Sequence, residues 1–294
     1  MVSCLSPDEA RLLDRLTLGG GPAATAAAPT GVRRSRARGF DLEFHEYRRY
    51  QPGDDPRSID WSVEARLRQL VVRVSRAQGH VPLHVLVDVS GSMGIGTPPK
   101  VACARKIAAA LGYVAIARRD AAGVSTFGDD VLVHVRPAHG RLQLFHLFDA
   151  LATTEARGPS DVDRALERYA AAARGPGLAA VLSDFFGSAP GLPGLRALIA
   201  RGLTPAVVQI VAPEESDPQI LGFTELVDVE HDDEAPVVVD ERALAGYRAR
   251  MAEHSASLRS ACLTAGLPYL QIGSDSPFRT MLSALEGAGL FGPS

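Results

Sequence analysis

Hydrophobic and polar positions along the chain change their pattern near residue 80. From there on, short apolar runs alternate with longer stretches whose apolar residues recur at helical spacing. The short runs predict strands at residues 82–89, 122–128, 130–137, 178–184, 204–213, 224–230, 237–240 and 268–273. The longer stretches predict helices at residues 100–119, 141–153, 161–174, 191–202 and 241–265. We expect residues 130–137 to form a hairpin with the strand before them.

Strands that alternate with helices in this way are typical of a mostly parallel sheet with helices on both faces. We therefore predict a doubly wound, Rossmann-like α/β fold. Ligands of such folds bind beyond the carboxyl ends of the strands. Two of the predicted strands end in an aspartate, Asp88 and Asp184, and these ends are the first places to look for a site.

The first 79 residues have a different pattern. Ser6 and Pro7 are suited to begin a short helix that ends near residue 16, and residues 19–31 are small residues typical of a linker. The segment "QPGDDPRSIDW", residues 51–61, predicts a packing or docking element, and residues 70–74 predict a strand. We divide the chain into an N-terminal region, residues 1–79, packed on an α/β domain, residues 80–294.

Composition and charge narrow the classes of function. The 294 residues carry a formal net charge of −3, so nucleic acid is not a predicted partner, and the Arg-rich residues 33–38 are interpreted as a solvated arm. The three cysteines form no CxxC pair, which predicts neither a disulfide framework nor a zinc site. No apolar run reaches the roughly 18 residues of a membrane span, and no secretory signal opens the chain. We expect a cytoplasmic protein without a membrane span.

The candidate chemistry lies at the two aspartate-terminated strands. Residues beyond a strand end at alternate positions point to the same side, so Asp88, Ser90 and Ser92 can converge. Ser160, at the start of a predicted helix, and Asp184 add a hydroxyl and a carboxylate. Oxygen ligands of this kind suit Mg²⁺ or Mn²⁺ better than zinc. Singly, each residue has a plainer interpretation as a turn former or a helix cap.

Two motifs resemble known families. The D-x-S-x-S pattern at Asp88, Ser90 and Ser92, with a later hydroxyl residue and a strand-terminal aspartate, resembles the metal-ion-dependent adhesion site of von Willebrand factor type A domains. The segment "FHEYRRYQPGDDPRSIDWSVEAR", residues 44–66, resembles the bacterial family catalogued as domain of unknown function 58. Members of that family are often encoded beside MoxR-type AAA ATPases. The resemblance covers about residues 39–273.

The resemblance implies a protein-interaction module that depends on a divalent metal. The metal would be held by Asp88, Ser90, Ser92, Ser160 and Asp184, and an acidic residue of a protein partner, a MoxR-type ATPase or its client, would complete its coordination. One departure is Ser160, which stands where the type A site usually has threonine, so the methyl group that fixes the rotamer is absent. The resemblance implies an adaptor or assembly factor without catalytic activity.

Two alternatives remain. The first is a metal-dependent hydrolase or phosphotransfer enzyme that uses the Asp88, Ser90 and Ser92 loop. It is disfavoured because Thr97 and Pro98 stand where a phosphate-binding loop needs lysine and a hydroxyl residue, and because no nucleophile-elbow glycine is in register. The second is a structural scaffold whose metal site does not function, with residues 51–61 making the contacts.

Overall fold

The computed structural model describes residues 4–19, 46–50, 59, 61–74, 82–188, 191–230 and 234–293. The chain forms two compact units. The larger unit contains residues 1–29 and 81–294, and the smaller one contains residues 30–80. Most of the predicted linker at residues 19–31 and most of the predicted packing element at residues 51–61 lie outside the described residues.

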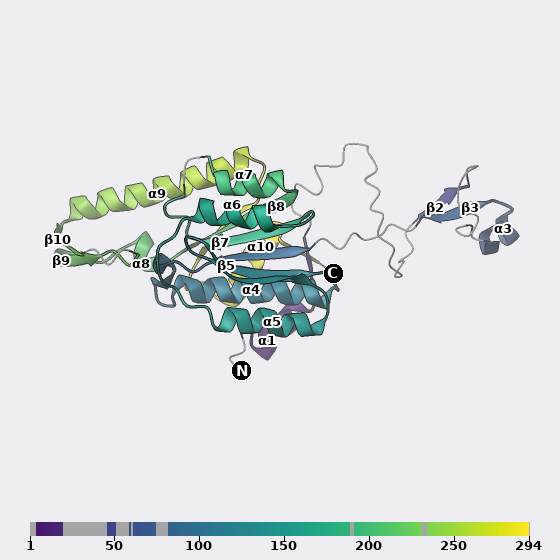
Figure 1. Ribbon diagram of the computed structural model, residues 1–294, viewed down its shortest axis with the longest axis horizontal. Helices are drawn as coiled ribbons and strands as arrows, with labels where there is room; N and C mark the ends of the chain where they lie inside the picture. The colour runs from purple at the N-terminus through teal and green to yellow at the C-terminus, as the bar shows by residue number, and fades with distance from the viewer. Residues whose placement is uncertain are drawn as a thin grey trace. The chain divides into compact units, whose positions relative to one another are not determined.

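A six-stranded sheet forms the centre of the larger unit (Figure 1). Its strands lie in the order β11-β8-β7-β4-β5-β6, and all neighbours are parallel except β5 and β6. The strands are β4 (Leu83–Asp88), β5 (Ala122–Phe127), β6 (Val131–Ala138), β7 (Gly177–Ser183), β8 (Leu203–Val211) and β11 (Tyr269–Gly273). The predicted α/β class, the mostly parallel Rossmann-like sheet and the β5–β6 hairpin are confirmed.

Helices cover both faces of this sheet. The helices of the larger unit are α1 (Pro7–Leu13), α4 (Lys100–Ala117), α5 (Arg141–Ala152), α6 (Val162–Ala172), α7 (Pro193–Ala200), α8 (Pro213–Ser216), α9 (Glu241–Thr264) and α10 (Phe278–Gly287). Side chains of β4 alternate between the two faces, as strand geometry requires. Val85 and Val87 pack in the core formed with α4, whereas Leu86 belongs to the core formed with α6 and α7.

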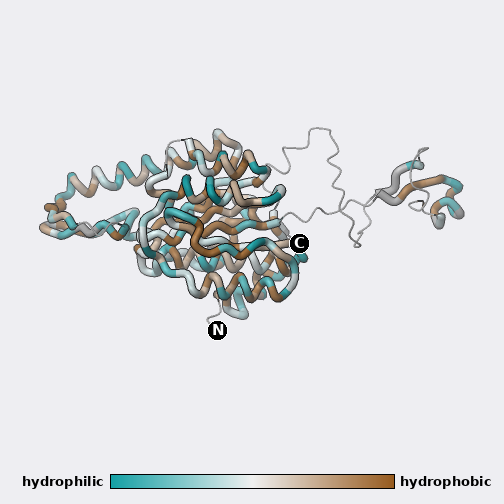
Figure 2. Tube along the Cα trace, viewed as in Figure 1, coloured by the Kyte–Doolittle hydropathy of each residue, from teal (hydrophilic) through white to brown (hydrophobic). Residues whose placement is uncertain are grey.

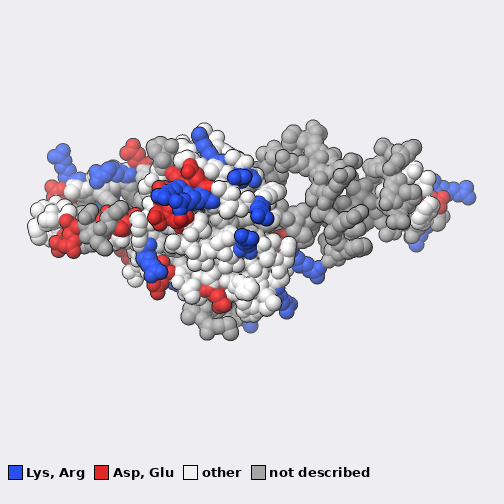
Figure 3. All heavy atoms as spheres, viewed as in Figure 1, with Lys and Arg blue, Asp and Glu red and all other residues white. Residues whose placement is uncertain are grey.

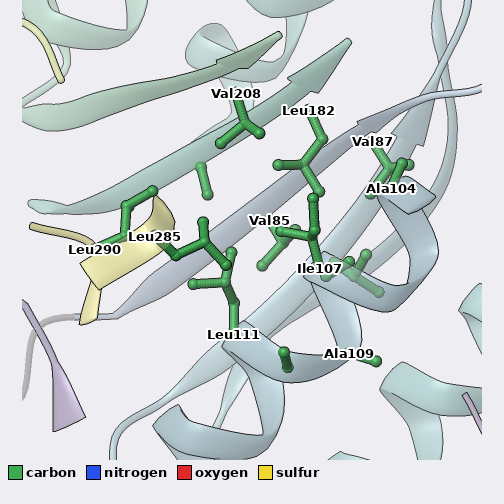
Figure 4. Packing of buried hydrophobic residues seen from close by; sticks show 14 of the residues in the cluster. Val85, Val87, Ala104, Ile107, Ala109, Leu111, Leu182, Val208, Leu285 and Leu290 are labelled. Carbon is green, nitrogen blue, oxygen red and sulfur yellow. The ribbon is translucent and has the colours of Figure 1, made fainter. Parts of the chain in front are cut away.

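The central strands are mostly apolar because each face of the sheet packs against helices. Ile107 and Leu111 of α4 pack near Val85 of β4, Leu182 of β7 and Val208 of β8 (Figure 4). All six residues of β4 are buried, and the hydrophobic colour of Figure 2 is concentrated along the central strands. Burial on both faces is the reason that these strands read as continuous apolar runs rather than alternating ones.

The two ends of the chain meet in the larger unit. The predicted first helix is present as α1, where the side chain of Ser6 caps the N–H of Glu9 and the Glu9 carboxylate accepts from the N–H of Ser6. Strand β1 (Leu16–Leu18) pairs antiparallel with β12 (Phe291–Pro293). Neither of these short strands, nor α10, was predicted from the sequence, because their apolar stretches are short.

Residues 224–230 differ from the expectation that they continue the strand series. Strand β9 (Gly222–Val227) pairs antiparallel with β10 (Glu234–Val239), and the two form a separate hairpin outside the central sheet. This β9–β10 hairpin projects from the sheet beside the start of α9 (Figure 1). Its exposed side chains include Phe223 and Val238, which are 79% and 72% exposed.

The described residues of the smaller unit include a two-stranded sheet and the helix α3. Strand β2 (Glu46–Arg49) pairs antiparallel with β3 (Val71–Val74), and α3 (Trp61–Leu67) lies between them in the sequence. The predicted strand at residues 70–74 is thus present. Ile59 bridges to Val72 and is buried, whereas Trp61 is exposed.

The surface charge, the hydropathy of the helices and the state of the cysteines can be compared with the expectations from composition. On the face of the larger unit shown in Figure 3, basic and acidic side chains lie interspersed. Among the described residues, no helix is long and apolar enough to cross a membrane. All three cysteines are free thiols.

Candidate functional site

The candidate site begins where β4 ends. Asp88 is the last residue of β4, and its Oδ1 accepts a hydrogen bond from the backbone N–H of Ser90 at 2.9 Å. The chain then turns into a 3₁₀ helix, η2 (Gly91–Gly94), and the hydroxyls of Ser90 and Ser92 lie 3.0 Å apart. The backbone turn that follows the strand therefore places the carboxylate and both hydroxyls together, as the D-x-S-x-S spacing predicts.

The neighbouring strand β7 brings the second aspartate to the same edge. Strand β7 pairs in parallel with β4, so their carboxyl ends lie side by side. Ser183, the last residue of β7, donates its hydroxyl hydrogen to Asp88 Oδ2 at 2.6 Å. Asp184 follows directly and receives the N–H of Phe186 on Oδ1 at 3.0 Å. The structure thus brings Asp88 and Asp184 to adjoining strand ends.

The loop before α6 carries Ser160 to this edge. The N–H of Gly91 donates to the carbonyl of Gly158 at 2.8 Å, and the N–H of Arg157 donates to the carbonyl of Val89 at the same distance. These bonds tie the loop to the segment that follows β4. The Ser160 hydroxyl oxygen is buried and has no hydrogen-bond partner in the described part of the chain. Ser160 therefore lies in a loop that is bonded to the segment after β4, and its hydroxyl oxygen is unused.

Because Asp88 and Asp184 are both buried, it is unfavourable for both carboxylates to be ionised at the same time. Asp88 is fully buried and Asp184 is 1% exposed. Burial, together with the smaller effect of the nearby negative charge of Asp184, raises the pKa of Asp88 to about 7, although hydrogen bonds from Ser183 and Ser90 act to lower it. A positive charge at this edge would stabilise both ionised carboxylates.

Lys100 supplies one such charge, and sequence reasoning did not place it in the site. Its side chain at the start of α4 is completely buried. The ammonium donates to Asp184 Oδ2 at 2.7 Å, forms a second ion pair with Glu215 of α8, and lies 5.0 Å from the centre of the Phe186 ring. The signal available in the sequence was weak: Lys100 is one of only two lysines in a chain that otherwise uses arginine.

The charges of this group do not balance. Asp88, Asp184 and Glu215 are all buried, and among the described residues the Lys100 ammonium pairs with Asp184 and Glu215 but not with Asp88. With all three carboxylates ionised, the group carries a net charge of −2. Burial also raises the pKa of Glu215, although Lys100 opposes this effect. Buried charge of one sign is stabilised either by protonation or by a bound cation.

The donor set fits a hard divalent cation. Two carboxylates and three serine hydroxyls, one of them without a partner, are oxygen ligands of the kind that Mg²⁺ and Mn²⁺ prefer. The described residues hold no group of three or more His, Cys, Asp or Glu side chains that could hold a metal ion, so any ion at this edge would depend on the serine hydroxyls as well. A dication at this edge would be held by Asp88, Ser90, Ser92, Ser160 and Asp184.

Comparisons with known proteins identify relatives but no activity. The family described as "Protein of unknown function DUF58" matches residues 46–257. Uncharacterized proteins of Mycobacterium tuberculosis and Mycobacterium bovis are each 28% identical over 243 residues, which are 78% of this chain and 74% of theirs.

Two solved structures resemble the fold distantly. The protein BatB from Bacteroides thetaiotaomicron aligns with a TM-score of 0.44 and 13% identity over 71% of this chain and 98% of its own. An aerotolerance-related membrane protein from Bacteroides fragilis aligns with a TM-score of 0.46 and 12% identity over 70% of this chain and 99% of its own. We base no functional argument on these two alignments.

Proposed function

This chain belongs to the family of unknown function DUF58, and from that premise we propose that it is a protein-interaction module that depends on a divalent metal. The proposal assigns Asp88, Ser90, Ser92, Ser160 and Asp184 as the residues that hold Mg²⁺ or Mn²⁺. The observation that carries it is the charge of the site, where three carboxylates are buried and the one ammonium, that of Lys100, pairs with Asp184 and Glu215 only. A divalent cation would neutralise the remaining two negative charges.

A bound dication with an incomplete set of protein ligands would attract the carboxylate of a partner protein. The chain's own residues would orient the ion and exclude water, since the strand ends around Asp88 and Asp184 are buried. We propose no catalytic step at this loop. The Ser90 hydroxyl contacts the Ser92 hydroxyl and not a histidine that could activate it. On the family resemblance alone, we propose a MoxR-type ATPase or its client as the partner and the cytoplasm as the location.

Titration calorimetry with Mg²⁺ and with Mn²⁺ tests the metal site. We expect saturable binding to the metal-stripped wild-type protein. Asp88→Ala should weaken this binding at least about 10-fold, because removing even a residue that only hydrogen-bonds to a metal ligand has an effect of that size, and Asp88 is itself a proposed ligand. Asp149→Ala, an exposed aspartate on α5, should leave the affinity unchanged. Absent binding to the wild type, or equal binding to Asp88→Ala, would contradict the proposal.

The structural-scaffold alternative is favoured by one specific observation. Each site carboxylate already accepts hydrogen bonds within the chain, from Ser183 and Ser90 at Asp88 and from Lys100 and Phe186 at Asp184. A protein of this kind would need no metal to fold. The same titration separates the two functions, because a scaffold predicts no saturable binding to the wild type.

A further inference from the structure

Residues 228–230, which follow β9, reach the candidate site, although β9 and β10 lie outside the central sheet. The N–H of Ser160 donates to Glu230 Oε2 at 3.2 Å. The carbonyl oxygen of Val229 lies against Gly91, where an added Cβ would be only 2.3 Å from that oxygen. The N–H of Glu230 donates to Asp228 Oδ1 at 2.8 Å, which shapes the turn. The β9–β10 hairpin thus contacts both loops that carry the site serines.

This contact helps to close the site. Asp88 and Ser90 are fully buried, and Ser92 is 9% exposed, so a carboxylate from another protein has no direct access to them in this conformation. Glu230, which is only partly buried, brings an acidic side chain of the same chain to Ser160. That serine holds the buried hydroxyl without a partner. The kind of group that the proposed function expects from a partner is therefore already present within the chain.

We propose that Glu230 is an internal acidic ligand of the Asp88–Asp184 site, and that a partner's carboxylate must displace it. This inference rests on the proposed metal-dependent function. A backbone N–H such as that of Ser160 needs only a neutral acceptor, whereas a carboxylate oxygen also suits a hard cation. In the isolated protein, the Glu230 carboxylate would occupy the position of the partner's carboxylate. A partner would bind only if its own carboxylate competes with Glu230 for that position.

The construction of the hairpin permits such displacement. Strands β9 and β10 pair with each other and, within the described part of the chain, with no strand of the central sheet. Val229 and Glu230 can therefore move away from Gly91 and Ser160 without breaking a strand pairing of the central sheet. Loops that open locally are those with few buried apolar contacts, and the exposed Phe223 and Val238 place this hairpin in that class.

Mn²⁺ binding to the full chain tests the role of Glu230. Glu230→Gln keeps an oxygen that can accept from Ser160 but removes the charge, and Glu225→Gln changes an exposed glutamate of the same hairpin as a control. Three quantities are measured: the Mn²⁺ dissociation constant, the number of exchangeable waters on bound Mn²⁺ from water-proton relaxation, and amide hydrogen exchange of residues 222–239.

We expect Glu230→Gln to weaken Mn²⁺ binding about 10-fold and to add about one exchangeable water to the bound ion, because a carboxylate ligand is lost. Mn²⁺ should slow hydrogen exchange of the hairpin in the wild type and in Glu225→Gln, but not in Glu230→Gln. Added acetate should remove the extra water in Glu230→Gln and leave the wild type unchanged, because only the variant offers a free position.

The outcomes separate the two proposals. Mn²⁺ binding that is identical in all three proteins, with the same water count and the same hairpin protection, would overturn the role of Glu230 and leave the metal site in place. No Mn²⁺ binding to any of them would overturn the metal site itself, and with it the internal ligand. Loss of binding in Glu225→Gln as well would show that the hairpin acts through its fold rather than through Glu230.

Discussion

Replacing Lys100 with methionine is expected to lower the free energy of unfolding by about 3–5 kcal/mol, the loss typical of breaking a buried ion pair. The ammonium is completely buried between Asp184 and Glu215, so its removal leaves both carboxylates in the interior without a cation. Methionine has a similar length, which limits the change in packing. Urea unfolding monitored by circular dichroism measures the difference.

Lys106→Met on the same helix is the matched control. Lys106 pairs with Glu9 at 3.0 Å, but its side chain is 39% exposed, so water screens the pair and the loss should stay below about 1 kcal/mol. The double variant Lys100→Met with Glu215→Gln should lose less than the sum of the two single variants, because it removes one of the two carboxylates that Lys100→Met leaves unpaired. Equal losses for Lys100→Met and Lys106→Met would contradict the buried role of Lys100.

Acidification is expected to destabilise the protein through His84 by about 2.5 kcal/mol between pH 7.5 and pH 4.5. His84 lies in β4, away from the candidate site, and its Nδ1 is 2.7 Å from the Tyr169 hydroxyl. Burial, with a smaller effect of His134, lowers the pKa of His84 to about 4. Below pH 6.5 the unfolded chain binds a proton at this residue that the folded protein does not bind. The stabilising contribution is therefore complete above pH 6.5 and is lost as the pH falls toward 4.

The free energy of unfolding as a function of pH checks this expectation. Between pH 7.5 and pH 4.5, the free energy of unfolding of His84→Gln should fall less than that of the wild type. The comparison does not depend on the stability of the variant at neutral pH, because the other groups titrate equally in both proteins. His146→Gln, an exposed histidine on α5, should keep the wild-type dependence. If the free energy of unfolding falls by the same amount in the wild type and in His84→Gln, the pKa of His84 is not lowered by its burial.

Much of the fold could be predicted from residue patterns. The apolar run of β4 is buried on both faces, the periodic run of α4 is a helix of nearly the predicted length, and Ser6 caps α1 as its position indicates. Each of these signals depends on neighbours within a few residues, because a strand or helix exposes or buries its side chains at a fixed local period.

Part of the candidate site was also predictable, for the same reason. The D-x-S-x-S spacing is local, and the structure joins Asp88, Ser90 and Ser92 as the spacing indicates. Parallel strand pairing brings Asp184 to the edge where Asp88 lies, which the aspartate at the end of each strand indicated. The metal itself stays a prediction that the titrations above test.

The sequence by itself determined most of the strands and helices around the central sheet, and which strand ends carry oxygen ligands, because those features follow from local periodicity. Only the tertiary structure decided that Lys100 pairs with Asp184 and Glu215, which are 84 and 115 residues away. It also decided that the β9–β10 hairpin leaves the sheet and places Glu230 against Ser160, 70 residues earlier. Such contacts depend on strand order and on the paths of crossovers, and no period in a single sequence records which distant ends will meet.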